Sequence, residues 1–271
     1  MQLLCSTGTI SRNPDITDYQ QVLRYGPQLA VEGFELMFYE AWYSNLDRIA
    51  SDLQQSGLKF PAMHTEKNIG VAFGSMEAQK REQGVHNLAQ NCQLAQAIGT
   101  QILVLHLWGW PQLDDNLENN LQPLTTCLDV ATQYGVKLAI ETIPGRKTDP
   151  LSNVFRAIEH DPRCTVALDT EFLANSQQLD AVFDANWLWQ EGRVRHVHIK
   201  DFDGHGFTPD GKRRYLHPGE GHINFTSFFA NLKEQRFDGY ISLEAPAIDQ
   251  MGNVDIQQLN ESLEFVKQIM Q

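Results

Sequence analysis

Short runs of apolar and β-branched residues alternate with longer amphipathic segments along the chain. The short runs are typical of buried strands, whereas apolar residues spaced three or four apart are typical of helices. The expected strands are Leu3–Ser6, Gly33–Met37, Phe60–His64, Ile102–Leu107, Lys137–Thr142, Thr165–Asp169, Val194–Lys200 and Tyr240–Glu244. The expected helices are Thr17–Ala30, Leu46–Gln55, Met76–Ile98, Leu117–Tyr134, Leu151–His160, Leu179–Ala185, Phe225–Gln235 and Ile256–Met270.

Strand and helix alternate eight times within 271 residues. This repeat predicts an α/β fold of the (β/α)8 TIM barrel type, in which a strand and its helix together take about 30 residues. An open doubly wound sheet is the competing architecture, but no GxGxxG sequence follows the first strand, where a dinucleotide-binding fold would carry it. No linker rich in Pro or Gly divides the chain, so we expect one barrel domain over residues 1–271.

The amino-acid composition limits the classes of partner that this protein is expected to bind. The chain has 34 Asp and Glu against 21 Lys and Arg, which gives a formal net charge of −13. An acidic protein is repelled by phosphate backbones, so we expect no nucleic-acid partner. The four cysteines have no CxxC spacing, and the first residues lack the pattern of a signal peptide. No apolar run approaches the roughly 18 residues of a membrane span. We therefore expect a cytoplasmic protein with no membrane partner. The sequence leaves open whether the protein forms a homo-oligomer.

Titratable residues stand at the C-terminal ends of most of the expected strands. They are Glu35, His64, His106, Glu141, Asp169, His198 and Glu244. In a parallel barrel these strand ends meet at one rim, where active sites lie. Taken singly, each residue also has an ordinary structural explanation: a histidine as a hydrogen-bonded core residue, and a carboxylate as a helix N-cap or the partner of an arginine. Taken together, so many carboxylates resist burial unless a cation compensates them, and a divalent metal ion is the simplest such cation.

The segment "VRHVHIKD" places His196, His198 and Lys200 on one side of an expected strand. Because side chains alternate along a strand, these three point into the barrel and the residues between them point toward the helices. Lys200 then lies at the mouth of the barrel. There it either contacts a substrate oxygen or pairs with Asp201 or Asp169.

Five stretches resemble the xylose isomerase-like TIM barrels, which comprise sugar and sugar phosphate isomerases and epimerases together with the family-two AP endonucleases. The stretches are "LAIET", "VALDT", "HVHIKD", "HPGEGHINF" and "GYISLE", in the family's order. The resemblance implies one divalent metal ion held by four residues. His196 lies one layer deeper in the barrel than the implied ligand His198, where we expect it to support the site or the fold. The implied ligands are Glu141, Asp169, His198 and Glu244. Three carboxylates and an imidazole suit Mn²⁺, Mg²⁺, Co²⁺ or Zn²⁺.

The same resemblance implies a metal-dependent isomerase or epimerase of a sugar or a sugar-like hydroxy-carbonyl compound. In such enzymes two glutamates, by position Glu141 and Glu244, move the proton next to a carbonyl while the metal stabilises the enediolate. A metal-dependent lyase, such as a dehydroshikimate-type dehydratase, begins with the same step and stays open, as does a non-catalytic sugar-binding barrel. An AP endonuclease is disfavoured, because Arg213 and Tyr215 stand where that branch has an Asp-x-His pair.

Further side chains are expected to contact the small-molecule substrate. His64 and His106 end two strands, and Trp108 follows in "HLWGWP". The long polar segment before the eighth strand carries His217 and the basic run 212–214, which either meet a substrate carboxylate or phosphate or lie in a solvated loop. Further aromatic candidates for stacking on a sugar ring are Phe38, Trp42, Trp110 and Phe172.

Overall fold

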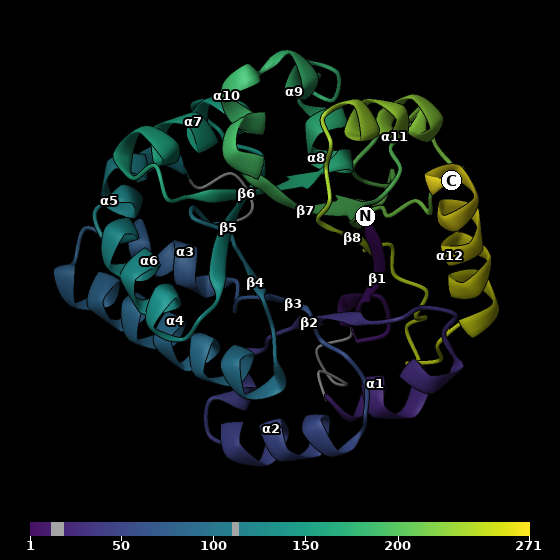
Figure 1. The fold of residues 1–271 in the computed structure, drawn as a ribbon, viewed down its shortest axis with the longest axis horizontal. Helices are drawn as coiled ribbons and strands as arrows, with labels where there is room; N and C mark the ends of the chain where they lie inside the picture. Colours follow the sequence, from purple (N-terminus) through teal and green to yellow (C-terminus); the bar gives the residue numbers. More distant parts are fainter. Residues whose placement is uncertain (12–18, 110–113) are drawn as a thin grey trace.

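The computed structural model describes residues 1–11, 19–109 and 114–271. In these residues parallel strands close into a barrel in the order β1 to β8, with β8 paired to β1 (Figure 1). The strands are β1 Gln2–Ser6, β2 Phe34–Met37, β3 Ala62–His64, β4 Ile102–Leu105, β5 Lys137–Glu141, β6 Thr165–Asp169, β7 Val194–Ile199 and β8 Tyr240–Leu243. The predicted (β/α)8 barrel is therefore confirmed.

The helices lie on the outer side of the ring of strands, as Figure 1 shows. Those of the described residues are α1 Gln20–Tyr25, α2 Leu46–Gln55, α3 Asn68–Phe73, α4 Ala78–Ile98, α5 Leu117–Leu121, α6 Leu124–Gln133, α7 Pro150–His160, α8 Thr170–Asn175, α9 Ala181–Asp184, α10 Asn186–Trp189, α11 Phe225–Glu234 and α12 Ile256–Met270. The apolar residues between helices and strands form one extensive buried cluster.

Some helix predictions were wrong in detail. The predicted helix Leu117–Tyr134 is two helices, α5 and α6, because Pro123 lies between them and a proline has no N–H to continue the helical hydrogen bonds. The predicted helix Thr17–Ala30 starts outside the described residues, and its described part is α1 followed by a 3-10 turn, Gly26–Gln28. The short helices α3 and α8 were not predicted.

The inner face of the barrel changes from apolar to titratable along the strands. A small buried cluster consists of strand residues alone, namely Leu4, Ala62, Ile102, Val104, Ala139 and Ala167. Several of them precede a buried titratable residue by two positions: Ala62 and His64, Val104 and His106, Ala139 and Glu141, and Ala167 and Asp169. Residues two apart on a strand share a face, so the barrel floor is apolar and its C-terminal mouth carries the charged groups.

The long connection between β7 and α11 is fixed by Asp201. Its carboxylate accepts hydrogen bonds from the backbone N–H groups of Gly219, Gly221 and Ile223, at 2.8, 2.9 and 3.0 Å. A Cβ at Gly221 would lie 2.5 Å from Asp201 Oδ1, so this close approach requires glycine. Asp201 therefore organises the loop at the barrel mouth.

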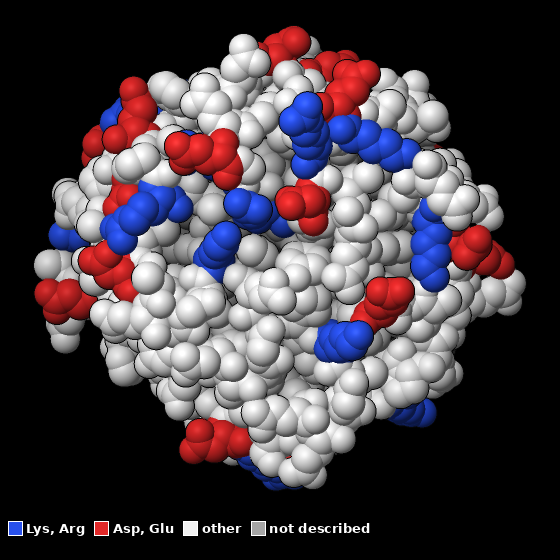
Figure 2. Space-filling view, in the orientation of Figure 1, with Lys and Arg blue, Asp and Glu red and all other residues white. Residues whose placement is uncertain are grey.

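The surface shows mixed charge. On the face drawn in Figure 2, Lys and Arg are interspersed with Asp and Glu, and uncharged residues cover most of the area. Among the described helices, none is both long enough and apolar enough to cross a membrane.

Candidate active site

Four residues from neighbouring strand ends converge at the mouth of the barrel. Glu141 ends β5, Asp169 ends β6, His198 lies in β7 and Glu244 directly follows β8. All four are buried, and one ligand atom of each lies within 4.8 Å of the others. The structure thus brings together the four residues that the sequence resemblance implied as metal ligands.

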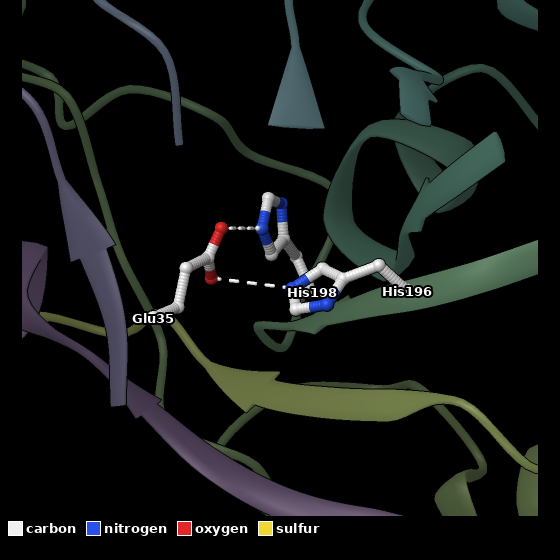
Figure 3. Close-up of side chains that lie close together, drawn as sticks. All are labelled: Glu35, His196 and His198. Carbon is white, nitrogen blue, oxygen red and sulfur yellow. Dashed lines mark hydrogen bonds and ion pairs between the residues drawn. The ribbon is translucent and has the colours of Figure 1, made fainter. Parts of the chain in front are cut away.

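His198 links this group to a deeper carboxylate. Its Nδ1 atom lies 2.8 Å from Glu141 Oε1 and 3.9 Å from both Asp169 Oδ2 and Glu244 Oε2. On the other side of the ring, Nε2 lies 2.8 Å from Glu35 Oε1, and the second oxygen of Glu35 lies 3.2 Å from His196 Nε2 (Figure 3). One nitrogen of His198 therefore faces the four-residue group, and the other is held by Glu35.

The geometry of these side chains fits a divalent cation. Asp169 accepts the backbone N–H of Phe172 with Oδ1, at 2.9 Å, and so caps the start of α8, while Oδ2 faces the group. A carboxylate on the far nitrogen of a ligand histidine fixes the orientation of the ring, and Glu35 occupies that position. Three carboxylates and one imidazole make an oxygen-rich donor set of the kind divalent ions bind.

The buried groups shift one another's pKa values. Burial alone would raise the pKa of Glu141, but His198 and His106 outweigh it and hold that pKa well below its usual range. Burial would lower the pKa of His198, but the surrounding carboxylates, Glu35 foremost, raise it well above its usual range. For Asp169, burial raises the pKa to about 6 although Lys200 opposes the shift. Without a metal, protons and an ammonium group therefore balance the carboxylates.

That ammonium group belongs to Lys200, which directly follows β7. Its Nζ atom lies 2.7 Å from Asp169 Oδ2 and 2.5 Å from Glu244 Oε2. The pairing with Asp169 is one of the two that the sequence left open, and the contact with Glu244 is additional. Asp201, the other partner considered, is occupied by the backbone of its own loop.

His64 and His106 both contact Glu141, the glutamate at the end of β5. Their Nε2 atoms lie 3.3 and 2.6 Å from Glu141 Oε2. The Nδ1 atom of His64 is 2.7 Å from the carbonyl oxygen of Thr65. Burial lowers the pKa of His106 to about 4, although Glu141 opposes the shift, so His106 is neutral near pH 7. One ligand atom from each of these three residues also lies within 4.8 Å of the others.

A cavity of about 20 Å³, enough for a water molecule, lies beside the four-residue group. It is lined by Lys67, His106, Glu141, Phe172, Lys200, Arg213, Tyr215 and Glu244. A wider pocket of about 440 Å³ adjoins it, since Lys67 and Tyr215 line both, and Phe38 lines the wider one. The expected aromatic candidates Phe38 and Phe172 thus border the space beside the ligand group.

Other expected substrate contacts lie elsewhere. His217 is buried, with Nδ1 2.7 Å from Ser262 Oγ and Nε2 3.2 Å from the carbonyl oxygen of Pro246, so it fastens the loop to α12. Trp108 is fully buried and donates its indole N–H to the carbonyl of Pro144 at 3.1 Å. Neither is among the residues that line the cavity. Two more candidates are Trp42, which is buried, and Trp110, which lies outside the described residues.

Within the basic run 212–214, Arg213 lines the cavity, whereas Lys212 and Arg214 are not among its lining residues. Lys212 and Arg214 form surface ion pairs with Asp210 and Asp203, at 3.1 and 2.6 Å. Arg213 lines the cavity and forms an ion pair with the buried Glu171. Its guanidinium carbon also lies 5.1 Å from the ring centre of Tyr215.

Several residues of this site could not be identified from the sequence. Glu35 was noted only as a strand-end acid, and nothing in the local pattern marked it as the partner of a histidine 163 positions later. Glu171, Lys67 and Tyr215 had no signal at all, because they lie in short helices and loops without a regular period. Their positions depend on how the loops fold over the mouth.

Comparison with known proteins identifies the family of this chain. A family model described as xylose isomerase-like TIM barrel matches residues 23–269, so the chain belongs to that family. An uncharacterised protein of Methanocaldococcus jannaschii, MJ1311, is 25% identical over 208 residues, which are 73% of this chain and just under two thirds (66%) of that relative.

Two solved structures share the fold at low sequence identity. The D-allulose 3-epimerase of Methylomonas sp. has a TM-score of 0.74 at 16% identity and covers 99% of this chain and 98% of its own. The probable 3-DHS dehydratase of Bacillus anthracis has a TM-score of 0.71 at 16% identity, with 98% and 99% covered. Sugar epimerases and a dehydratase are thus among the structural neighbours of this protein.

Proposed function

We propose that this protein is a metal-dependent isomerase or epimerase of a sugar or a sugar-like hydroxy-carbonyl compound. One observation carries the proposal: Glu141 and Glu244 belong to the buried four-residue ligand group and also line the small cavity beside it. They come from β5 and β8, which lie well apart around the ring of strands. Two carboxylates on separate walls of one cavity can remove a proton from one face of a substrate carbon and return it on another.

The proposed ligands are the same four residues that the family resemblance implies: Glu141, Asp169, His198 and Glu244. A divalent ion held there, Mn²⁺, Mg²⁺, Co²⁺ or Zn²⁺, would polarise a substrate carbonyl and make the neighbouring C–H bond more acidic. The low pKa of Glu141 keeps it ionised, as a carboxylate ligand of a metal must be.

Substrate binding is proposed for the side chains around the cavity. His106 is neutral and close to the proposed reacting centre, so it can donate or accept a hydrogen bond with a substrate hydroxyl. Lys200 adds a positive charge to the lining of the same cavity, and His64 contacts Glu141 through its Nε2 atom. His217 and Trp108, which lie away from the cavity, are left out of this proposal.

Solvent deuterium exchange tests the proposal. Metal-loaded protein is mixed in D₂O with ketoses, their phosphates, inosose-like cyclitols and hydroxy-keto acids, and proton NMR follows the carbon next to the carbonyl. The proposal predicts deuterium incorporation into at least one class of compound, which stops when a chelator removes the metal. Exchange that continues without metal, or none across all the classes, would contradict it.

A metal-dependent lyase is the second candidate. The Lys200 ammonium lies 2.5 Å from Glu244 Oε2, so a proton source adjoins the proposed base and can assist a departing hydroxyl. The similar fold of a probable dehydratase agrees with this candidate. In the same NMR experiment a lyase would yield a dehydrated, unsaturated product, whereas an isomerase or epimerase would yield an isomer of the substrate that differs in composition only by the incorporated deuterium.

A further inference from the structure

We propose that Lys200 is the built-in counter-ion of the ligand group, and that its ammonium and the divalent ion compete for the same two carboxylate oxygens. This inference rests on the metal site proposed above. It assigns to Lys200 a charge-compensating role in the metal-free protein and a substrate-facing position once the metal is bound.

The competition follows from which atoms Lys200 contacts. Its Nζ atom lies 2.7 Å from Asp169 Oδ2 and 2.5 Å from Glu244 Oε2. These same two oxygens each lie 3.9 Å from His198 Nδ1, so they face the group of ligand atoms. Two cations in contact with one pair of oxygens repel each other strongly where water is excluded. The ammonium therefore has to withdraw when a divalent ion binds.

The metal-free protein needs this ammonium. Lys200, Asp169 and Glu244 are all buried, and Glu141 lies beside them. Carboxylates buried together repel one another and spread apart unless a cation lies between them. By contacting two of the proposed ligands, Lys200 offsets the repulsion between Asp169 and Glu244, but it occupies the same oxygens that the metal needs.

The backbone of Lys200 is fixed, so the exchange is made by its side chain. The Thr170 hydroxyl donates to the carbonyl oxygen of Lys200 at 2.7 Å, and the N–H of Lys200 donates to the same hydroxyl at 3.0 Å. These bonds tie the end of β7 to the start of α8. The flexible four-carbon stem of a lysine then allows the ammonium to move while the strand stays in place.

A second position for the ammonium already exists. Nζ lies 4.8 Å from the ring centre of Phe172, within the range of a cation–π contact, and both side chains line the cavity. On leaving Asp169 and Glu244, the ammonium can remain over this ring at the cavity wall. Metal binding would thereby turn Lys200 from a partner of the ligands into a cation that faces the substrate.

Metal affinity and metal-free stability test this inference without any substrate. Lys200→Met removes the charge and keeps much of the stem. Its metal-free form should melt roughly 6–15 °C below the wild type, because a buried ion pair loses one partner. Its Mn²⁺ affinity, measured by competition with a fluorescent chelator, should rise roughly tenfold or more, whereas loss of ordinary support around a metal site lowers affinity 10- to 100-fold. A higher Mn²⁺ affinity in Lys200→Met therefore supports competition by Lys200, and a lower affinity contradicts it.

Two further variants complete the test. Lys67→Met removes a charge from the lining of the same cavity and should change both quantities less. If Lys200→Met does not fold without metal, Lys200→Gln, which keeps a hydrogen-bond donor but no charge, should still bind Mn²⁺ more tightly than the wild type. Unchanged or weaker Mn²⁺ binding in the Lys200 variants overturns the proposed role of Lys200 but not the proposed metal site. A wild type that binds no divalent ion overturns the proposed metal site itself.

Discussion

Glu35 holds His198 from the side away from the proposed metal: its Oε1 atom lies 2.8 Å from Nε2, while Nδ1 faces the ligand group. The neutral variant Glu35→Gln should lower metal affinity roughly 10- to 100-fold, because the ring loses the carboxylate that orients it and makes it a stronger ligand. Affinity is measured by chelator competition at pH 8, for both proteins in the same buffer. The surface variant Glu32→Gln serves as the control. Equal affinity in Glu35→Gln and wild type would show that Glu35 has no such role.

Metal binding should weaken as the pH falls through about 6. In the metal-free protein burial raises the pKa of Asp169 to about 6, and the surrounding carboxylates raise the pKa of His198. Both groups must lose their protons to bind a metal, so binding releases protons and is opposed by acid. Calorimetry at pH 6 in two buffers of different ionisation enthalpy should give different apparent heats. Identical heats would mean that no proton is released.

Either glutamine variant of the proposed acid–base pair should suppress deuterium exchange. Glu141→Gln and Glu244→Gln keep the side-chain size and remove the group that moves the proton, so the exchange rate should fall by a factor of roughly 10² or more. Because both residues are also proposed ligands, elemental analysis must show that each variant still carries metal. Glu264→Gln, on the exposed side of α12, is the control. Exchange that persists in both variants rules out this pair as the acid and base.

Asp114 should stabilise the fold independently of the site. Its buried carboxylate accepts the backbone N–H groups of Arg146 and Thr148, at 2.5 and 3.0 Å. Burial would raise the pKa of Asp114, but these and neighbouring hydrogen bonds lower it to about 2. Because the folded pKa is depressed, the stabilisation is present above the unfolded pKa of about 3.9 and is lost as the pH falls toward 2.

Asp114→Asn should therefore lower the free energy of unfolding at pH 7 by about 1–3 kcal/mol, the usual cost of broken buried hydrogen bonds. Urea titrations at pH 7 and pH 3 measure the difference, which should shrink at the lower pH. Asp129→Asn breaks an exposed ion pair with Arg163 and should cost less than about 1 kcal/mol. A cost for Asp114→Asn that is the same at both pH values would contradict the assignment.

The sequence predicted those features that follow from a regular period. The strands could be recognised by their apolar runs, and residues such as Asp169 and His198 could be placed at one rim because parallel strand ends meet there. Pro123 was present in the sequence, but the periodic pattern continued on both sides of it and concealed the break between α5 and α6.

Contacts between residues far apart in the sequence could not be predicted in the same way. Glu35 and His198 are 163 positions apart, and the partner of His217, Ser262, is 45 positions later in α12. Such pairs depend on strand tilt, loop path and rotamer, none of which leaves a local pattern. For the same reason the sequence identified Lys200 as a residue of the mouth but did not predict its contact with Glu244.

The metal content of the purified protein tests the central claim most directly. Protein prepared without chelators should contain about one divalent ion per chain by elemental analysis, bound by the group of Glu141, Asp169, His198 and Glu244. Asp169→Ala should lose that ion and remain folded by circular dichroism. Three ions per chain would restore the AP endonuclease interpretation. A metal-free wild type reconstituted with Mn²⁺ or Zn²⁺ that still binds none, or full metal content in Asp169→Ala, would contradict the account.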